Sequence, residues 1–216
     1  MQAPDNMTPC GPAARLNQQC FCLTLDRAVL ERSLRDQLDE AELEHLLTDE
    51  HRHLFAEAPL FVLQADVERM HWVVQSIEAA ARLPGYRQAV LGWASATASF
   101  NPGPIGALMG YDFHLTASGP RLIEVNTNAG GAFINTLLAR AQSACCPETV
   151  RAPRTRAQLE AFEDAVVRMF EREWQRQRGE GRPESVAIVD DRPEAQYLYP
   201  EFRLAQQVMQ AHGIKT

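Results

Sequence analysis

The chain has 216 residues and a net charge of −7, from 21 Lys and Arg against 28 Asp and Glu. At about 100–200 residues per domain, this length allows one or two domains with a buried core. Hydrophobic residues at 45% and charged residues at 23% are typical of globular proteins. The acidic balance argues against nucleic acid as the main partner, because neutralising phosphates needs a basic surface.

The sequence also argues against a membrane protein or a secreted one. No apolar run approaches the ~18 residues of a membrane span, and the first residues lack the basic and apolar regions of a secretory signal. Five cysteines, an odd number, fit reduced thiols. We therefore expect a cytoplasmic protein with no membrane partner.

Residues 1–54 are predicted to form a loose N-terminal segment followed by helices. Residues 1–20 carry several prolines without apolar periodicity. Asp26 is the predicted N-cap of the first helix. The apolar residues that then recur at helical spacing are Val29, Leu30, Leu34 and Leu38, and the pattern continues through Leu43, Leu46 and Leu47.

Residues 55–150 form the second predicted region. Asp66 is expected to cap a helix that ends at Ala81, before Pro84 and Gly85. A shorter helix follows over about residues 86–94. Two strand-like runs and a helix over about residues 132–142 complete the region.

The last two predicted regions are a helical linker, residues 151–182, and an α/β segment, residues 183–216. The linker carries a helix over about residues 157–178. The segment contains a buried strand over 185–189, a helix over 200–211 that ends at His212 and Gly213, and the start of another strand. Asp190 and Asp191 follow the first strand; we expect them to cap the next helix, with a ligand crevice as the alternative.

Residues 110–126 predict a β-hairpin. With residues 117–119 as a three-residue loop, Gly119 takes the left-handed position that such loops favour. The strands then pair residue by residue, with side chains alternating between two faces. The pairs expected across the hairpin are Thr116 with Pro120, His114 with Leu122, and Asp112 with Glu124.

One face of this hairpin is predicted to be apolar and the other to bind a metal. The apolar face would carry Tyr111, Phe113, Leu115, Ile123 and Val125. The other face brings two carboxylates directly opposite each other, beside an amide, so that a cation is expected between them. Oxygen donors of this kind suit Mg²⁺ better than Zn²⁺. The expected ligands are Asp112, Glu124 and Asn126, with His114 as a bystander; a solvated sheet face is the alternative.

Residues 111–115 and 122–131 together resemble the metal-binding hairpin of ATP-grasp enzymes. That pattern is an Asp, a Glu-x-Asn about a dozen residues later, and a Gly-containing loop. The resemblance implies that Asp112, Glu124 and Asn126 bind Mg²⁺ bridging the phosphates of ATP. It also implies that Asn128, Gly130 and Gly131 contact phosphate or the acceptor substrate.

The order of motifs resembles circularly permuted members, the group that includes glutathionylspermidine-synthetase-like proteins. The implied fold is α+β: an ATP-grasp-like antiparallel sheet flanked by helices, an N-terminal helical region, and the start of a Rossmann-like pre-ATP-grasp domain. Members hold ATP with two lysines, whereas this chain has only Lys215. The lid is expected after Thr216, which predicts a fragment, a truncated product or a degenerate homologue.

The resemblance implies an ATP-dependent ligase that joins a small-molecule carboxylate to an amine or a thiol through an acyl phosphate. The alternative is a truncated module that binds a metal, a nucleotide or a partner without turnover. A thiol or zinc protein is a weaker rival, because Cys20 and Cys22 are closer than the ligands of structural zinc sites. The clustered histidines, His45, His51 and His53, lack a second ligand group with matching spacing.

Overall fold

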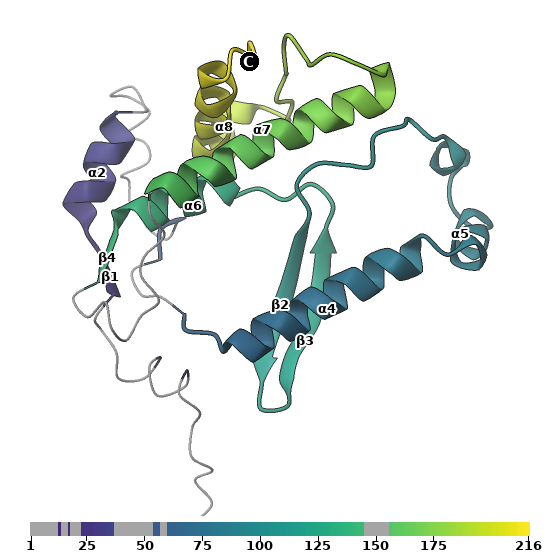
Figure 1. The fold of residues 1–216 in the computed structure, drawn as a ribbon, viewed down its shortest axis with the longest axis horizontal. Coiled ribbons are helices and arrows are strands. Elements are labelled where there is room, and N and C mark those ends of the chain that lie inside the picture. The colour runs from purple at the N-terminus through teal and green to yellow at the C-terminus, as the bar shows by residue number, and fades with distance from the viewer. Residues whose placement is uncertain (1–12, 14–16, 18–22, 37–53, 57–59, 145–155) are drawn as a thin grey trace, which may run out of the picture.

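The computed structural model describes residues 13, 17, 23–36, 54–56, 60–144 and 156–216. A helical body and an extended arm make up this part of the chain (Figure 1). The body contains β1 (Leu23–Leu25), α2 (Arg27–Arg35), α6 (Ala132–Ala141), β4 (Gln142–Ala144), α7 (Arg156–Arg178), the short η3 (Pro193–Ala195) and α8 (Tyr199–Ala211). The arm contains α4 (Gln64–Ala81), α5 (Pro84–Leu91), the short η2 (Ala96–Ser99), β2 (Gly110–Thr116) and β3 (Gly119–Asn126).

Both sheets in the described residues are small, two-stranded and antiparallel: β1 pairs with β4, and β2 pairs with β3. Helices make up most of the remaining regular structure. This mixture agrees with the α+β class that the sequence predicts.

The hydrophobic core of the body is centred on α6. Buried side chains occupy successive turns of this helix because its apolar residues recur at helical spacing. They pack against α2, α7 and α8, so that one cluster joins elements from distant parts of the chain. Its members are Leu30, Leu34, Phe55, Phe133, Ile134, Leu137, Leu138, Ala141, Val166 and Leu204.

Asp26 begins α2 as predicted. Its side chain accepts hydrogen bonds from the backbone N–H groups of Ala28 and Val29, both at 3.0 Å. These bonds satisfy two of the donors that a helix leaves unpaired at its first turn.

The helix α4 begins earlier than predicted. Leu63 occupies the N-cap without a side-chain hydrogen bond, so Asp66 lies inside the first turn and caps nothing. A carboxylate is still favourable there, because the amino end of a helix carries partial positive charge. Pro84, which ends the predicted pattern, also starts α5, since proline is tolerated in the first turn of a helix.

The buried strand predicted over 185–189 is wrong apart from its first residues. Ser185 forms a single parallel bridge with Lys215. The backbone N–H of Val186 donates to the Lys215 carbonyl at 2.8 Å, and that of Lys215 donates to the Glu184 carbonyl at 3.1 Å. Val189 is 87% exposed. The run is apolar enough for a buried strand, but no described strand covers its later residues.

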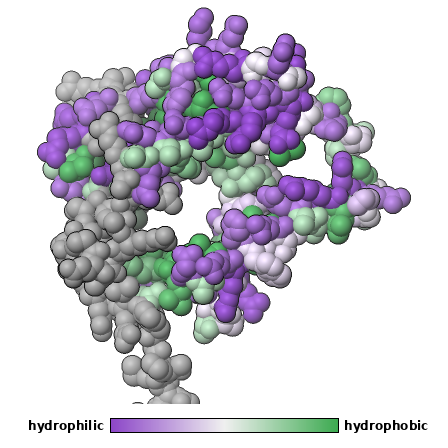
Figure 2. All heavy atoms as spheres, in the orientation of Figure 1, coloured by the Kyte–Doolittle hydropathy of each residue, from purple (hydrophilic) through white to green (hydrophobic). Residues whose placement is uncertain are grey.

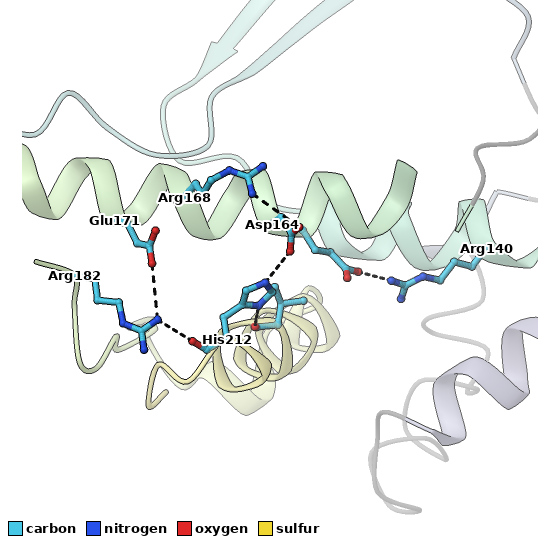
Figure 3. A network of polar contacts seen from close by, with 8 residues as sticks. Arg140, Asp164, Arg168, Glu171, Arg182 and His212 are labelled. Carbon is cyan, nitrogen blue, oxygen red and sulfur yellow. Dashed lines mark hydrogen bonds and ion pairs between the residues drawn. The ribbon is translucent and has the colours of Figure 1, made fainter. Parts of the chain in front are cut away.

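A polar network joins α7 to the end of α8 (Figure 3). The Nε2 atom of His212 lies 2.9 Å from Oδ1 of Asp164, and its Nδ1 lies 2.7 Å from the carbonyl oxygen of Val208. Arg182 donates to the carbonyl oxygen of His212 at 3.2 Å. These contacts hold the C-terminal segment against α7.

Figure 2 shows hydrophilic side chains over the outer part of the body where α7 lies, and hydrophobic patches near α5 at the end of the arm. None of the helices in the described residues combines the length and the hydropathy that a bilayer crossing requires.

Candidate functional site

The hairpin formed by β2 and β3 lies against α4 (Figure 1). The Tyr111 hydroxyl donates a hydrogen bond to Oε1 of Glu78 on α4, at 3.3 Å. Burial and the neighbouring Glu78 carboxylate raise the pKa of Tyr111 above its ordinary value. Since side chains alternate along a strand, the residues next to Tyr111 face away from α4. One face of the hairpin is therefore covered by a helix and the other faces solvent.

The predicted metal ligands lie together on the face turned away from α4. Asp112 pairs directly with Glu124, as expected, and Asn126 pairs with Gly110. The Nδ2 atom of Asn126 donates to Oε1 of Glu124 at 3.1 Å. All three side chains are exposed. The structure thus brings the two carboxylates and the amide to one accessible patch.

The register nearer the turn differs from the prediction. Thr116 pairs with Gly119, and His114 with Arg121, so the expected pairs with Pro120 and Leu122 are wrong. Only Ala117 and Ser118 lie between the strands, which shifts the pairing by one residue.

A β-bulge then reverses this shift. It lies between the pair that Asp112 forms and the pair that Phe113 forms with Leu122, so Ile123 has no partner of its own. Ile123 is 56% exposed, and Leu115 and Val125 of the predicted apolar face are also exposed, at 42% and 36%, so that part of this face is not buried. Because the short turn and the bulge cancel, the pairing of Asp112 with Glu124 is the same in the prediction and in the structure.

Electrostatically, the patch is acidic. None of the ion pairs between described residues involves Asp112 or Glu124. Arg121 lies on the same face, but its guanidinium reaches toward Ser118 Oγ, at 3.4 Å. Two opposed carboxylates without a cationic side chain between them favour an external cation.

The donor set suits a hard cation and would leave part of its coordination open. Carboxylate and amide oxygens are the ligands that Mg²⁺ prefers, and it usually keeps several waters. Rotation of the Asn126 amide would present Oδ1 in place of Nδ2. The described residues contain no cluster of three or more His, Cys, Asp or Glu side chains that could hold a metal. A metal at this patch would therefore depend on two carboxylates, the amide and non-protein oxygens.

The loop after β3 leads from this patch into the body. Gly131 has a φ of +89°, and its carbonyl accepts the Asn135 side-chain amide at 2.7 Å. Asn128 and Gly130 line a cavity of about 310 Å³ between this loop and α8. Two of the three residues predicted to contact phosphate or substrate thus border a cavity.

Glu201, on α8, occupies the amino end of α6. Its Oε1 accepts from the backbone N–H of Phe133 at 3.0 Å, and its Oε2 from that of Ile134 at 2.8 Å. Burial raises the pKa of Glu201, while the backbone donors, Gly131 among them, oppose that rise. A carboxylate of the chain itself therefore occupies the helix end where an anionic ligand would otherwise bind.

No sequence signal points to this role of Glu201. An acidic residue in the first turn of a helix, like Glu201 in α8, is common because it interacts favourably with the positive end of the dipole of that helix. That Glu201 caps a different helix follows only from the packing of α8 against α6.

Asp190 and Asp191 do not cap a helix. The N-caps of η3 and α8 are Arg192 and Leu198, and neither makes a side-chain capping bond. Oδ1 of Asp190 instead accepts from the Asp191 backbone N–H at 2.7 Å, and Asp190 lines the same cavity as Asn128. The alternative interpretation, an acid beside a crevice, is the one that the structure supports.

The cysteines and clustered histidines that could form a thiol or zinc site lie outside the described residues. All five cysteines fall there, as do His45, His51 and His53. Comparison with known proteins adds no assignment: no family model, curated protein or solved structure matches the chain. The motif and the geometry of the hairpin are therefore the basis for a function.

Proposed function

We propose that this chain supplies the Mg²⁺- and ATP-binding hairpin of an ATP-grasp-type ligase. The observation that carries the proposal is the position of Asp112 opposite Glu124, beside Asn126, on the hairpin face that α4 leaves exposed. Asn128 and Gly130, on the exposed loop that leads from this face into the body, stay in the proposed contact set. Gly131 also stays in the proposed contact set, although its backbone already interacts with the Glu201 carboxylate.

The proposed reaction joins a carboxylate to an amine or a thiol. The substrate carboxylate attacks the γ-phosphate of ATP, which gives an acyl phosphate and ADP. The amine or thiol then displaces phosphate. Such phosphoryl transfer asks the protein mainly for positioning and charge neutralisation.

In this proposal, Asp112, Glu124 and Asn126 hold Mg²⁺, and the bound ion neutralises charge on the ATP phosphates. The side chains themselves orient the nucleotide and need not act as nucleophile or base. This division fits an exposed patch of oxygen donors, because the remaining coordination positions stay accessible to phosphate oxygens.

Replacement of Glu124 by Gln tests the proposal. The variant keeps the size of the side chain but removes one charge from the carboxylate pair. We expect Mg²⁺-dependent ATP binding, measured by titration calorimetry, to weaken by about tenfold or more, and ATP-dependent ADP release to be lost. Glu180→Gln, at an exposed site away from the hairpin, is the matched control and should bind as the parent does. Unchanged binding or turnover in Glu124→Gln would contradict the proposal.

A second candidate, a binding module without turnover, is favoured by one observation. The chain has a single lysine, Lys215, whose backbone bridges Ser185, whereas the family it resembles uses two lysines to hold ATP. Magnesium-dependent ATP binding without any ADP release, across a panel of carboxylates and amines, would favour this second function over the ligase.

A further inference from the structure

The cavity beside the loop after β3 has the size of a small-molecule site. Its volume is about 310 Å³, at the lower end of the ~300–1,000 Å³ that such sites span. Its walls come from the segment before β2, the loop after β3, residues 186–190, and the helices α6, α7 and α8. The hairpin carboxylates, Asp112 and Glu124, do not line it, so it is a separate site from the proposed metal patch.

The walls of this cavity are mostly apolar. Aromatic rings from three different helices border it, together with aliphatic side chains from the segments between them. An apolar lining of this kind favours an occupant with an aromatic or aliphatic body. The main apolar contributors are Leu108, Phe133, Phe170, Val186, Phe202 and Met209.

The polar part of the lining carries acidic and neutral groups. The described residues that border the cavity include Glu201, Asp190, Asn128 and Thr216, and they include no Lys, Arg or His. Asp190 is exposed, whereas Glu201 is only 5% exposed. An anion here would meet two carboxylates without a compensating cation, which disfavours it.

Glu201 contributes a buried carboxylate to the wall of the cavity. Its oxygens accept from the backbone N–H groups of Phe133 and Ile134, and the backbone of Ala132 and Gly131 also lowers its pKa. Burial raises the pKa of Glu201, and a cation beside it would favour the charged form again. A ligand that carries positive charge therefore complements this residue.

We propose that the cavity binds a compact organic ammonium ion, with its aromatic or aliphatic body against the phenylalanine side chains and its ammonium group toward Glu201 and Asp190. The cavity shares Asn128 and Gly130 with the proposed contact set. The inference goes beyond the proposed function, because Glu201 and Asp190, which would hold the ammonium group, take no part in that function.

Three probes of similar shape test the charge preference. Phenethylamine, phenylethanol and phenylpropionate carry the same ring on a short chain that ends in a cation, a neutral group or an anion. We expect calorimetry in magnesium- and nucleotide-free buffer to show phenethylamine binding at least about tenfold tighter than the other two. Equal binding of all three, tighter binding of the anion, or no binding of the amine would overturn the inference. Because no nucleotide is present, this result is independent of the Glu124→Gln test.

Variants of the lining test the location. Ala205→Leu adds volume inside the cavity and should weaken phenethylamine binding by about tenfold or more. Asp190→Asn removes an exposed charge and should weaken it by about two- to fivefold, without disturbing the core. Asp191→Asn, which does not line the cavity, is the matched control and should bind as the parent does. Parent-like affinity in both Ala205→Leu and Asp190→Asn, or equal losses in Asp190→Asn and Asp191→Asn, would contradict the proposed location.

Discussion

The surroundings of His212 favour the protonated form of its side chain. Both of its ring nitrogens face oxygen acceptors, the carbonyl of Val208 and the carboxylate of Asp164. A neutral imidazole has one N–H and can donate to only one of them, whereas an imidazolium donates to both. The hydrogen bond to Asp164 and then that to Val208 raise the pKa of His212. The charged form therefore links the end of α8 to α7.

This linkage predicts a pH dependence of stability. In the unfolded state the pKa of His212 is near 6.5, and in the folded state it is higher. Its stabilising contribution is therefore complete below that value and is lost as the pH rises through the folded-state pKa. We expect His212→Gln to lower the urea midpoint more at about pH 5.5 than at about pH 9. The other charged groups around His212 are Asp164, Glu163, Arg168 and Arg182.

His114→Gln is the matched control, because His114 is exposed on the hairpin, in a different part of the chain from α7 and α8. A loss of stability in His212→Gln that is equal at both pH values, or larger at the higher one, would contradict the protonated link.

At the scale of elements, the hairpin depends on the turn between β2 and β3. Gly119 has a φ of +105°, a conformation that residues with a Cβ rarely adopt. A Cβ at this position would also lie 2.8 Å from Nη1 of Arg69 on α4. The Arg69 side chain is largely exposed and can move, so the backbone conformation is the main constraint.

Gly119→Ala should therefore destabilise the protein by about 1–3 kcal/mol, measured by chemical denaturation. Gly85→Ala in α5 provides the comparison: a Cβ there meets nothing within 4 Å, and alanine restricts the unfolded chain more than glycine does, so this variant should not lose stability. Similar stability changes in the two variants would show that the turn does not require glycine.

At the scale of the whole molecule, the body and the arm differ in how much they bury. The two hydrophobic clusters of described residues consist of side chains outside α4, α5 and the hairpin. Neither α4 nor α5 contains a buried residue, and exposed aromatic side chains, Trp72 and Trp93 among them, lie in this part of the chain. The arm thus has less apolar burial to hold it folded than the body has.

Local stability follows burial, since segments with few buried contacts open at lower free energy. We expect backbone amides of α4, β2 and β3 to exchange with deuterated solvent faster than those of α6, α7 and α8, as measured by mass spectrometry. Uniform protection of both parts would contradict this division. Addition of Mg²⁺ and ATP should slow exchange in the hairpin if the proposed function holds, because binding stabilises the conformation that binds.

Much of the secondary structure follows from local patterns. The start of α2 and both ends of α6, α7 and α8 lie within one or two residues of the expected positions, since helical periodicity and capping act over a few neighbouring residues. The end of α2 at Arg35 comes earlier than expected, because the predicted pattern runs on through Leu38. The left-handed Gly213 after α8 also agrees with its predicted role. The pairing of Asp112 with Glu124 is likewise confirmed, although two errors of register cancel on the way to it.

The sequence by itself determined the helices of the body, the hairpin and the gathering of Asp112, Glu124 and Asn126 on one face, because turns and side-chain alternation fix these locally. The tertiary structure decided the bulge at Ile123, the single bridge between Ser185 and Lys215 and the capping of α6 by Glu201. Those outcomes depend on which segments pack together over long distances in the chain, and no local periodicity records that choice. The cavity lined by Asn128, Asp190 and Glu201 exists for the same reason, since its walls come from segments that only folding brings side by side.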